Sequence, residues 1–249
     1  ILLNMLKILK QKKRKNIIFG NLLIKMINRR SFIVGIKGTK LDNQEIKFLN
    51  QYKPWGIILF SRNLKDIKQI KSLTKKIRKI FRDKYYPIII DQEGGRVNRL
   101  DKFISLDYLT SEYFGKLYIK DKRQFNLIYK LFIDKTSHLL SSLGININTA
   151  PVLDLRYKGS SNIIGDRSYS NDPKVVSKIG DICIKNFKNN SIASVIKHIP
   201  GHGLAKVDSH HFTPTIDKTF NFLKKNDFKT FKSKNSLFAM TAHVIFNKI

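Results

Sequence analysis

Short runs of β-branched and other apolar residues alternate along the chain with longer segments in which apolar residues recur every three or four positions. The short runs predict six strands, at residues 32–35, 56–60, 88–91, 145–148, 195–198 and 237–242. The longer segments predict helices over residues 42–49, 64–81, 125–143, 173–189 and 220–231. Nearly continuous apolar strands alternating with amphipathic helices are typical of a parallel sheet covered by helices.

Six such units in succession predict an α/β fold of the TIM (β/α)₈ barrel type, incomplete in this chain at about six of eight units; a doubly wound sheet is the competing fold. The polar residues favour the barrel, because barrels carry their active groups at the carboxyl ends of the strands. Asp91, Asn148 and the pair Lys197 and His198 close three of the predicted strands, and residues 241–243 stand at the end of the last.

A single domain is expected from the 249 residues, because 42% of them are hydrophobic and no Gly/Ser-rich or Pro-rich linker divides the chain. Residues 1–25 mix apolar residues with a basic run at 12–15 and lack a small-residue cleavage site. We therefore expect residues 1–25 to be a basic extension outside the fold, with the barrel domain over 26–249. Cys183, the only cysteine, stands among apolar residues, which indicates a buried helix face and a reducing, cytoplasmic location.

The formal net charge of +30 invites a nucleic-acid-binding interpretation. However, the lysines are spread over the whole chain, no nucleic-acid-binding motif accompanies them, and Lys, Asn and Ile are used heavily together. A solvated basic surface is the favoured interpretation, and a basic nucleic-acid-binding protein remains an alternative. No apolar run of about 18 residues is present, so no membrane-spanning helix is expected.

Four of the six histidines lie between residues 197 and 211, a segment that Pro200, Gly201 and Gly203 prevent from being helical. This concentration of polar groups in one loop predicts a reaction site. A metal site built from His198, His202, Asp208, His210 and His211 is the rival interpretation. The spacing of four between His198 and His202 suits a metal only on a helix, so we expect neither metal nor cofactor.

Asp208 and His210 are two positions apart, so on an extended loop their side chains face the same way. The carboxylate can then accept the imidazole N–H and favour the protonated ring. Such a ring can give its proton to a leaving oxygen and later act as a base toward water. His202 and His211 are interpreted as structural.

Three segments carry a family resemblance: residues 91–99 (DQEGGRVNR), 164–169 (IGDRSY) and 197–203 (KHIPGHG) with 208–210 (DSH). Together they resemble the signature of family three glycoside hydrolases, most closely the bacterial β-N-acetylhexosaminidases that recycle cell-wall fragments, over roughly residues 31–246. The resemblance implies that His210 is the general acid/base and Asp208 its partner. It also implies that terminal N-acetylglucosamine is held by Asp91, Arg99, Arg167, Lys197 and His198.

Each of these roles has a structural alternative. Asp91 can accept bonds from two sugar hydroxyls or cap the following turn. Arg167 offers a fork of donors, held by Asp166, while Glu93 could pair with a nearby arginine. Lys197 and His198, as neighbours on a strand, are expected to face opposite ways, one toward the loop and the other toward ligand.

The resemblance also implies a nucleophilic Asp after a later strand, beyond the segment that ends at Ile249. Asp217 and Asp227 are poor substitutes, so we expect a C-terminally truncated barrel without its nucleophile. The predicted function is a retaining exo-β-N-acetylglucosaminidase that acts on muropeptide-derived saccharides and lacks membrane and nucleic-acid partners. A non-catalytic sugar-binding remnant is the alternative.

Overall fold

The computed structural model describes residues 29–207 and 213–249. The predicted extension over residues 1–25 and the candidate residues Asp208, His210 and His211 lie outside this part of the chain. The central sheet contains six strands: β1 (Arg30–Gly35), β2 (Pro54–Leu59), β3 (Ile88–Ile90), β6 (Ile147–Asn148), β7 (Ala193–Ile199) and β9 (Phe238–Thr241). All six predicted strands are therefore present.

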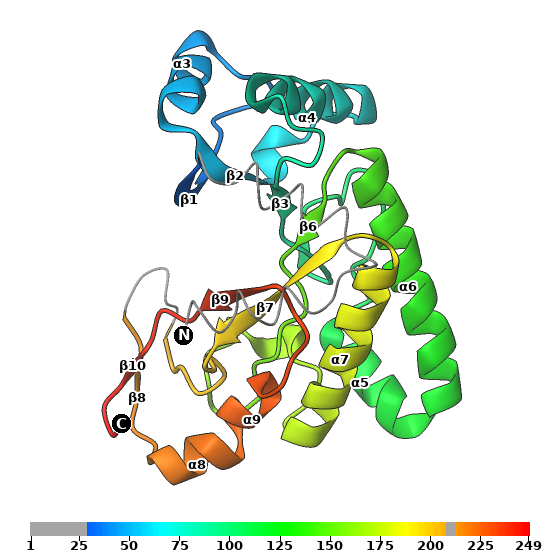
Figure 1. Cartoon of the computed structure of the whole chain (residues 1–249). Helices are drawn as coiled ribbons and strands as arrows, with labels where there is room; N and C mark the ends of the chain where they lie inside the picture. Colours follow the sequence, from blue (N-terminus) through cyan, green and yellow to red (C-terminus); the bar gives the residue numbers. More distant parts are fainter. Residues whose placement is uncertain (1–28, 208–212) are drawn as a thin grey trace, which may run out of the picture.

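The strands pair side by side in their order along the chain, and all five pairings are parallel. Figure 1 shows the sheet curling from β1 to β9, with helices on its outer side. A sheet in sequence order that curls in this way is part of a (β/α)₈ barrel, whereas a doubly wound sheet reverses its strand order. The predicted fold class, an incomplete TIM barrel, is confirmed.

The outer layer consists of α3 (Asn43–Tyr52), α4 (Ile67–Phe81), α5 (Ser111–Lys120), α6 (Lys122–Ser142), α7 (Pro173–Asn189), α8 (Phe220–Lys225) and α9 (Asp227–Phe231). The helix predicted over 220–231 is two short helices, separated at Asn226. Helix α5 was not among the predicted helices, although Thr110 caps it by accepting a hydrogen bond from the Tyr113 amide. Its glycine, Gly115, weakens the helical signal in the sequence.

The main core lies between the sheet and the helices, and Cys183 is buried there on α7 as predicted. A smaller apolar cluster occupies the concave side of the sheet, where Ile89, Ile147 and Val195 pack with Trp55 and Phe238. Several strands of the sheet thus contribute side chains to both apolar clusters. This packing fixes the carboxyl ends of the strands relative to one another.

Short elements extend from these carboxyl ends. Strands β4 (Gln92–Gly94) and β5 (Val97–Asn98) form an antiparallel hairpin directly after β3. Two 3₁₀ turns, η1 (Ser61–Asn63) and η2 (Gly165–Arg167), follow β2 and β6, and β8 (Thr215–Ile216) pairs with β10 (Ile245–Phe246). The hairpin turns at Gly94 and Gly95, whose φ angles of 97° and 55° favour glycine.

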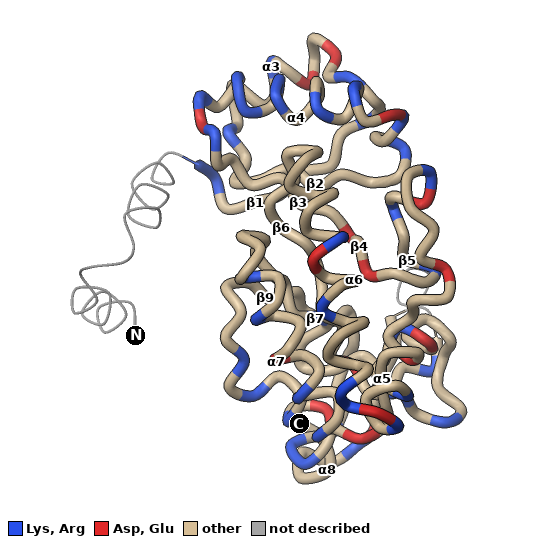
Figure 2. The backbone as a smooth tube through the Cα atoms, turned by 90° about the vertical axis from the view of Figure 1, so that its right-hand side faces the viewer, with Lys and Arg blue, Asp and Glu red and all other residues tan. Residues whose placement is uncertain are grey.

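Basic residues are distributed over the described surface. Figure 2 shows Lys and Arg along α3 and α4 at one end of the molecule and around α8 at the other. This distribution agrees with the interpretation of a solvated basic surface. No helix within residues 29–207 and 213–249 has the length and apolar character needed to cross a bilayer.

Candidate active site

A cavity of about 280 Å³ opens at the carboxyl ends of β3, β7 and β9. All five residues predicted to bind sugar line it: Asp91, Arg99, Arg167, Lys197 and His198. They come from three segments of the sequence, with Asp91 and Lys197 106 positions apart, and the fold alone brings them together. Asp208 and His210, the predicted proton-transfer pair, lie outside the described residues, so their roles stay predictions.

Lys197 lies at the centre of the polar groups, and its side chain is only 2% exposed. Its ammonium group is 3.0 Å from Asp91 Oδ1, 2.5 Å from Glu93 Oε1 and 3.0 Å from Thr149 Oγ1. Thr149 also donates its hydroxyl hydrogen to Asp91. A buried ammonium requires such partners, because burial without them would favour its neutral form.

Arg167 forms a two-pronged contact with Glu93, with Nε 2.8 Å from Oε2 and Nη2 2.9 Å from Oε1. Its Nη1 donates to the Ile163 carbonyl oxygen at 3.0 Å. The suggestion that Glu93 pairs with an arginine is confirmed. The suggestion that Asp166 holds Arg167 is wrong, because Asp166 pairs with Arg96 at 3.2 Å and leaves Glu93 to orient Arg167.

The two acids of this cluster are held in their ionised forms. Burial by itself would raise the pKa of Glu93, but Lys197 and Arg167 outweigh it and lower the pKa to about 2. Burial opposes ionisation of Asp91 as well, and the charge of Lys197 with the Thr149 hydrogen bond lowers its pKa. The cavity therefore presents fixed charges across the neutral pH range.

His198 is oriented by a buried acid that the sequence analysis did not single out. Its Nδ1 lies 2.6 Å from Asp154 Oδ2, and the backbone amide of His202 donates to Asp154 Oδ1 at 2.7 Å. Burial opposes ionisation of Asp154, but His198 lowers its pKa. With Nδ1 engaged, Nε2 is the ring nitrogen that His198 can offer to a ligand.

The expectation that Lys197 and His198 face opposite ways is not met, because both line the cavity. The pairing of β7 with β9 shifts register between Lys197 and Ile199, which interrupts the regular alternation of side chains. His202 also lines the cavity, and its backbone contact with Asp154 supports its predicted structural role.

Arg99 is the least constrained cation of the cavity. Its Nη2 is 3.8 Å from Asp91 Oδ2, farther than a hydrogen bond. Its Nε is buried and has no hydrogen-bond partner among the described residues. A buried donor of this kind costs free energy.

Asp91 and Glu93 are the carboxylates that line the cavity in the described part of the chain. Asp217 accepts a hydrogen bond from Asn247, and Asp227 is buried against Tyr157, so neither reaches the cavity. Asn148, which closes β6, is also structural, because its side chain bonds both backbone polar groups of Gln92. Within residues 29–207 and 213–249, no three His, Cys, Asp or Glu side chains form a metal-binding group.

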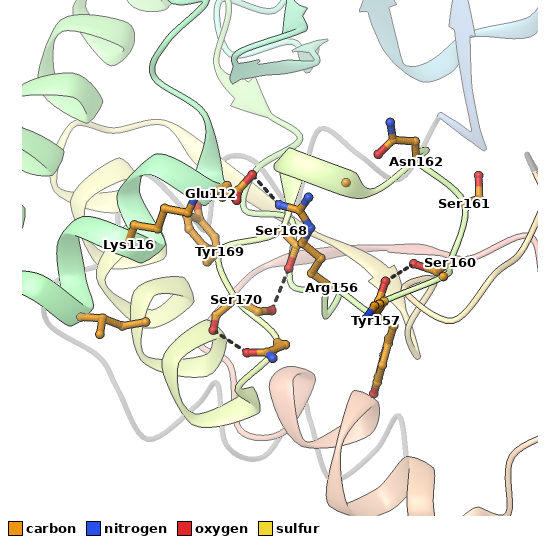
Figure 3. A pocket seen from close by; sticks show the side chains of 15 residues that line it. Glu112, Lys116, Arg156, Tyr157, Ser160, Ser161, Asn162, Ser168, Tyr169 and Ser170 are labelled. Atoms are coloured by element: carbon orange, nitrogen blue, oxygen red, sulfur yellow. Dashed lines mark hydrogen bonds and ion pairs between the residues drawn. The ribbon is translucent and has the colours of Figure 1, made fainter.

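A larger cavity of about 570 Å³ lies on the other side of the β6–α7 loop, between that loop and α5 (Figure 3). Three of its charged groups pair with each other, as Glu112 contacts Lys116 at 2.8 Å and Arg156 at 2.5 Å. These side chains are partly exposed, unlike Glu93 and Lys197. The buried, converging charges make the smaller cavity the candidate active site.

Sequence reasoning missed two residues that organise this site, Glu93 as a central acid and Asp154. The signal for Asp154 was present, because it is the single charge in the apolar run from Pro151 to Leu155. A lone acid in such a run is buried and needs partners. Its partners follow more than 40 positions later, so the sequence does not identify them.

A barrel sheet with a polar cavity at the carboxyl ends of its strands defines this protein as one of the (β/α)-barrel class that binds ligands at that end. The chain belongs to glycosyl hydrolase family 3, because residues 20–249 match the model for the "Glycosyl hydrolase family 3 N terminal domain".

Several known proteins are similar to this chain. A β-hexosaminidase of Hydrogenovibrio crunogenus is 33% identical over 221 residues, covering 87% of this chain and 61% of the relative. A β-hexosaminidase of Haemophilus influenzae is 33% identical over 223 residues, covering 88% of this chain and 62% of the relative. The chain thus spans about three fifths of the length of these relatives.

Solved structures agree with the sequence relatives. Native NagZ from Neisseria gonorrhoeae superposes with a TM-score of 0.80 at 29% identity, covering 88% of this chain and 64% of NagZ. The same protein in complex with N-trifluoroacetyl-D-glucosamine gives the same TM-score and identity, with 88% and 63% coverage.

Proposed function

We propose that this chain binds a terminal N-acetylglucosamine residue in the candidate active site, as the sugar-binding part of a retaining exo-β-N-acetylglucosaminidase. The observation that carries the proposal is the convergence of Asp91, Arg99, Arg167, Lys197 and His198 on one cavity. Membership of family 3 and the similarity to an amino-sugar complex of NagZ support the ligand class.

The geometry suggests how the sugar is held. Asp91 accepts hydrogen bonds from ring hydroxyls while Lys197 fixes its carboxylate. Arg99 lines the same cavity with a side chain that is 31% exposed, so its guanidinium can donate to the sugar. His198, oriented by Asp154, offers Nε2 at the rim.

In the proposed reaction, His210 protonates the leaving glycosidic oxygen and then removes a proton from water, with Asp208 orienting the ring. A retaining mechanism also needs a carboxylate that attacks the anomeric carbon. Asp91 and Glu93, the described acids of the cavity, are already paired with cations, so the proposal assigns the nucleophile to neither. We place the enzyme in the cytoplasm, where it would act on muropeptide-derived saccharides during cell-wall recycling.

Isothermal titration with N-acetylglucosamine tests the binding proposal directly. Asp91→Asn should weaken binding by about 10-fold or more, since it removes a charged acceptor worth about 1.5–3 kcal/mol. Asp107→Asn, at an exposed acid that does not line the cavity, is the matched control. Equal affinity in the Asp91→Asn variant and the parent would contradict the proposed role of the cavity.

A chromogenic β-N-acetylglucosaminide separates an active enzyme from a non-catalytic sugar-binding remnant. An active chain should release the chromophore, and His210→Ala should lower the rate by about 10²- to 10⁴-fold. Binding without hydrolysis would support the remnant. A chain that neither binds N-acetylglucosamine nor hydrolyses the chromogenic substrate would contradict the proposed function.

A further inference from the structure

Asp227 is a buried acid behind the cavity that the proposed mechanism does not use. It is the first residue of α9 and only 2% exposed. Its Oδ2 accepts the Tyr157 hydroxyl hydrogen at 2.8 Å. Its Oδ1 is buried without a hydrogen-bond partner in the described residues, so this carboxyl is costly for stability alone.

Asp227 lies directly against the turn that follows β7. A β-carbon placed on Gly201 would be 2.7 Å from Asp227 Cβ and 3.1 Å from its Oδ1. The Gly201 amide in turn donates to the His198 carbonyl oxygen at 2.8 Å. The turn that connects the cavity-lining residues His198 and His202 is therefore packed on the Asp227 side chain.

Tyr157 connects the same acid to the β6–α7 loop. Figure 3 shows its ring pointing out of the loop toward the helices drawn in faint orange. The Tyr157 carbonyl oxygen accepts the Ser160 hydroxyl hydrogen at 2.8 Å, which fixes the start of the loop. Farther along, the loop carries Ile164 and Arg167 into the cavity. One carboxyl group thus contacts two of the loops that form the site.

We propose that Asp227 is a positioning residue, which holds the Gly201 turn and, through Tyr157, the β6–α7 loop in the arrangement that shapes the candidate active site. It acts through His198, His202 and Arg167 and touches no reacting atom. The expectation that Asp227 thereby supports sugar binding rests on the proposed function.

The surroundings of Asp227 make this contact sensitive to pH. Burial raises its pKa to about 6, the Tyr157 hydrogen bond opposes this, and the charge of Asp154 adds to it. Asp154 itself is paired with His198, and on the adjacent α7 the charge of Asp181 is engaged by Lys234. Below pH 6 the neutral carboxyl packs between the loops, and above it an ionised, poorly solvated carboxylate faces the charge of Asp154.

Hydrogen exchange of the parent chain and of Asp227→Asn, Asp227→Ala and Tyr157→Phe tests the proposal. After correction for intrinsic rates, amides of residues 198–205 and 156–162 should exchange about 10-fold faster in Asp227→Ala than in the parent at pH 5. In the parent, their protection should fall between pH 5 and pH 7.5. In Asp227→Asn, which keeps an acceptor but cannot titrate, that pH dependence should disappear.

Asp107→Asn is the control and should exchange like the parent. Faster exchange confined to the two loops supports the positioning role of Asp227. If Asp227→Asn and Tyr157→Phe both show the exchange rates of the parent and the same pH dependence, the proposed role is wrong. If Asp227→Ala does not fold, those two variants still decide the question. A parent chain that binds no N-acetylglucosamine at any pH would refute the proposed function, and the exchange result would still test Asp227.

Discussion

The carboxylate of Glu93 and the ammonium of Lys197 form a 2.5 Å ion pair with both side chains almost completely buried, at 4% and 2% exposure. Glu93 also receives both prongs of the Arg167 guanidinium. Glu93, from the β4–β5 hairpin, thus joins Lys197 of β7 to Arg167 of the β6–α7 loop. Because each of these groups is buried, removing the partner of any one of them should strongly destabilise the fold.

Glu93→Gln should therefore destabilise the fold by about 3–5 kcal/mol, the usual result when one partner of a buried ion pair is removed. Glu112→Gln provides the matched control, because Glu112 also contacts two cations but at the partly exposed rim of the larger cavity. Glu112→Gln should lower the free energy of unfolding by about 1 kcal/mol or less. Urea unfolding of the three proteins at pH 7 measures both effects, and similar losses in the two variants would contradict this view of Glu93.

Glu93 should also contribute to acid denaturation. Its pKa lies at about 2 in the folded chain, below the ordinary value of 4.5, so the unfolded chain binds its proton more readily. The stabilisation is complete above pH 4.5 and is lost as the pH falls toward 2. Urea unfolding at a series of pH values should show a steeper loss for the parent than for Glu93→Gln, and parallel curves would refute the assignment.

Arg96 should control sugar affinity without touching the sugar. From the β4–β5 turn its Nη2 group, which has two hydrogens to donate, lies within hydrogen-bond distance of the carbonyl oxygens of Asn162, Ile163 and Ile164, the last two at 2.8 and 3.1 Å. Ile163 and Ile164 line the cavity. Arg96→Ala should weaken N-acetylglucosamine binding by about 10-fold, since each charge-assisted bond contributes about 1.5–3 kcal/mol.

Lys158→Ala is the control for Arg96, because Lys158 is an exposed cation of the same β6–α7 loop. Titration calorimetry should give the parent affinity for this variant. If both variants bind equally well, the loop does not depend on Arg96 for its position.

Gly115 provides a test of packing away from the cavity. A β-carbon at this position of α5 would lie 1.6 Å from the Tyr169 carbonyl oxygen, so Gly115→Ala must push the helix from the β6–α7 loop. We expect a loss of about 1–3 kcal/mol in urea unfolding. Gly38→Ala, at a site with no atom within 4 Å, should leave the midpoint almost unchanged. Equal midpoints for both variants would show that α5 adjusts freely.

Hydrophobic periodicity was sufficient to predict all six strands and most of the helices, because each depends on local alternation of apolar and polar residues. It was insufficient for α5, where Gly115 interrupts the helical pattern. The glycine is present for a tertiary reason, the close approach of Tyr169. Helix propensity disfavours glycine at position 115, but the close approach of Tyr169 leaves no room for a larger side chain.

The candidate site divides in the same way. The sequence by itself determined the barrel type of fold and the residues with suitable chemistry at the strand ends, because strand periodicity and residue type are local properties. Only the tertiary structure decided that Glu93 joins Lys197 to Arg167, that Asp154 orients His198 and that Asp227 supports both loops. The pairings of Glu93 and Asp154 join positions 44 to 104 residues apart, and Asp227 contacts a glycine and a tyrosine from two loops. These partners are selected by the curvature of the sheet and by burial.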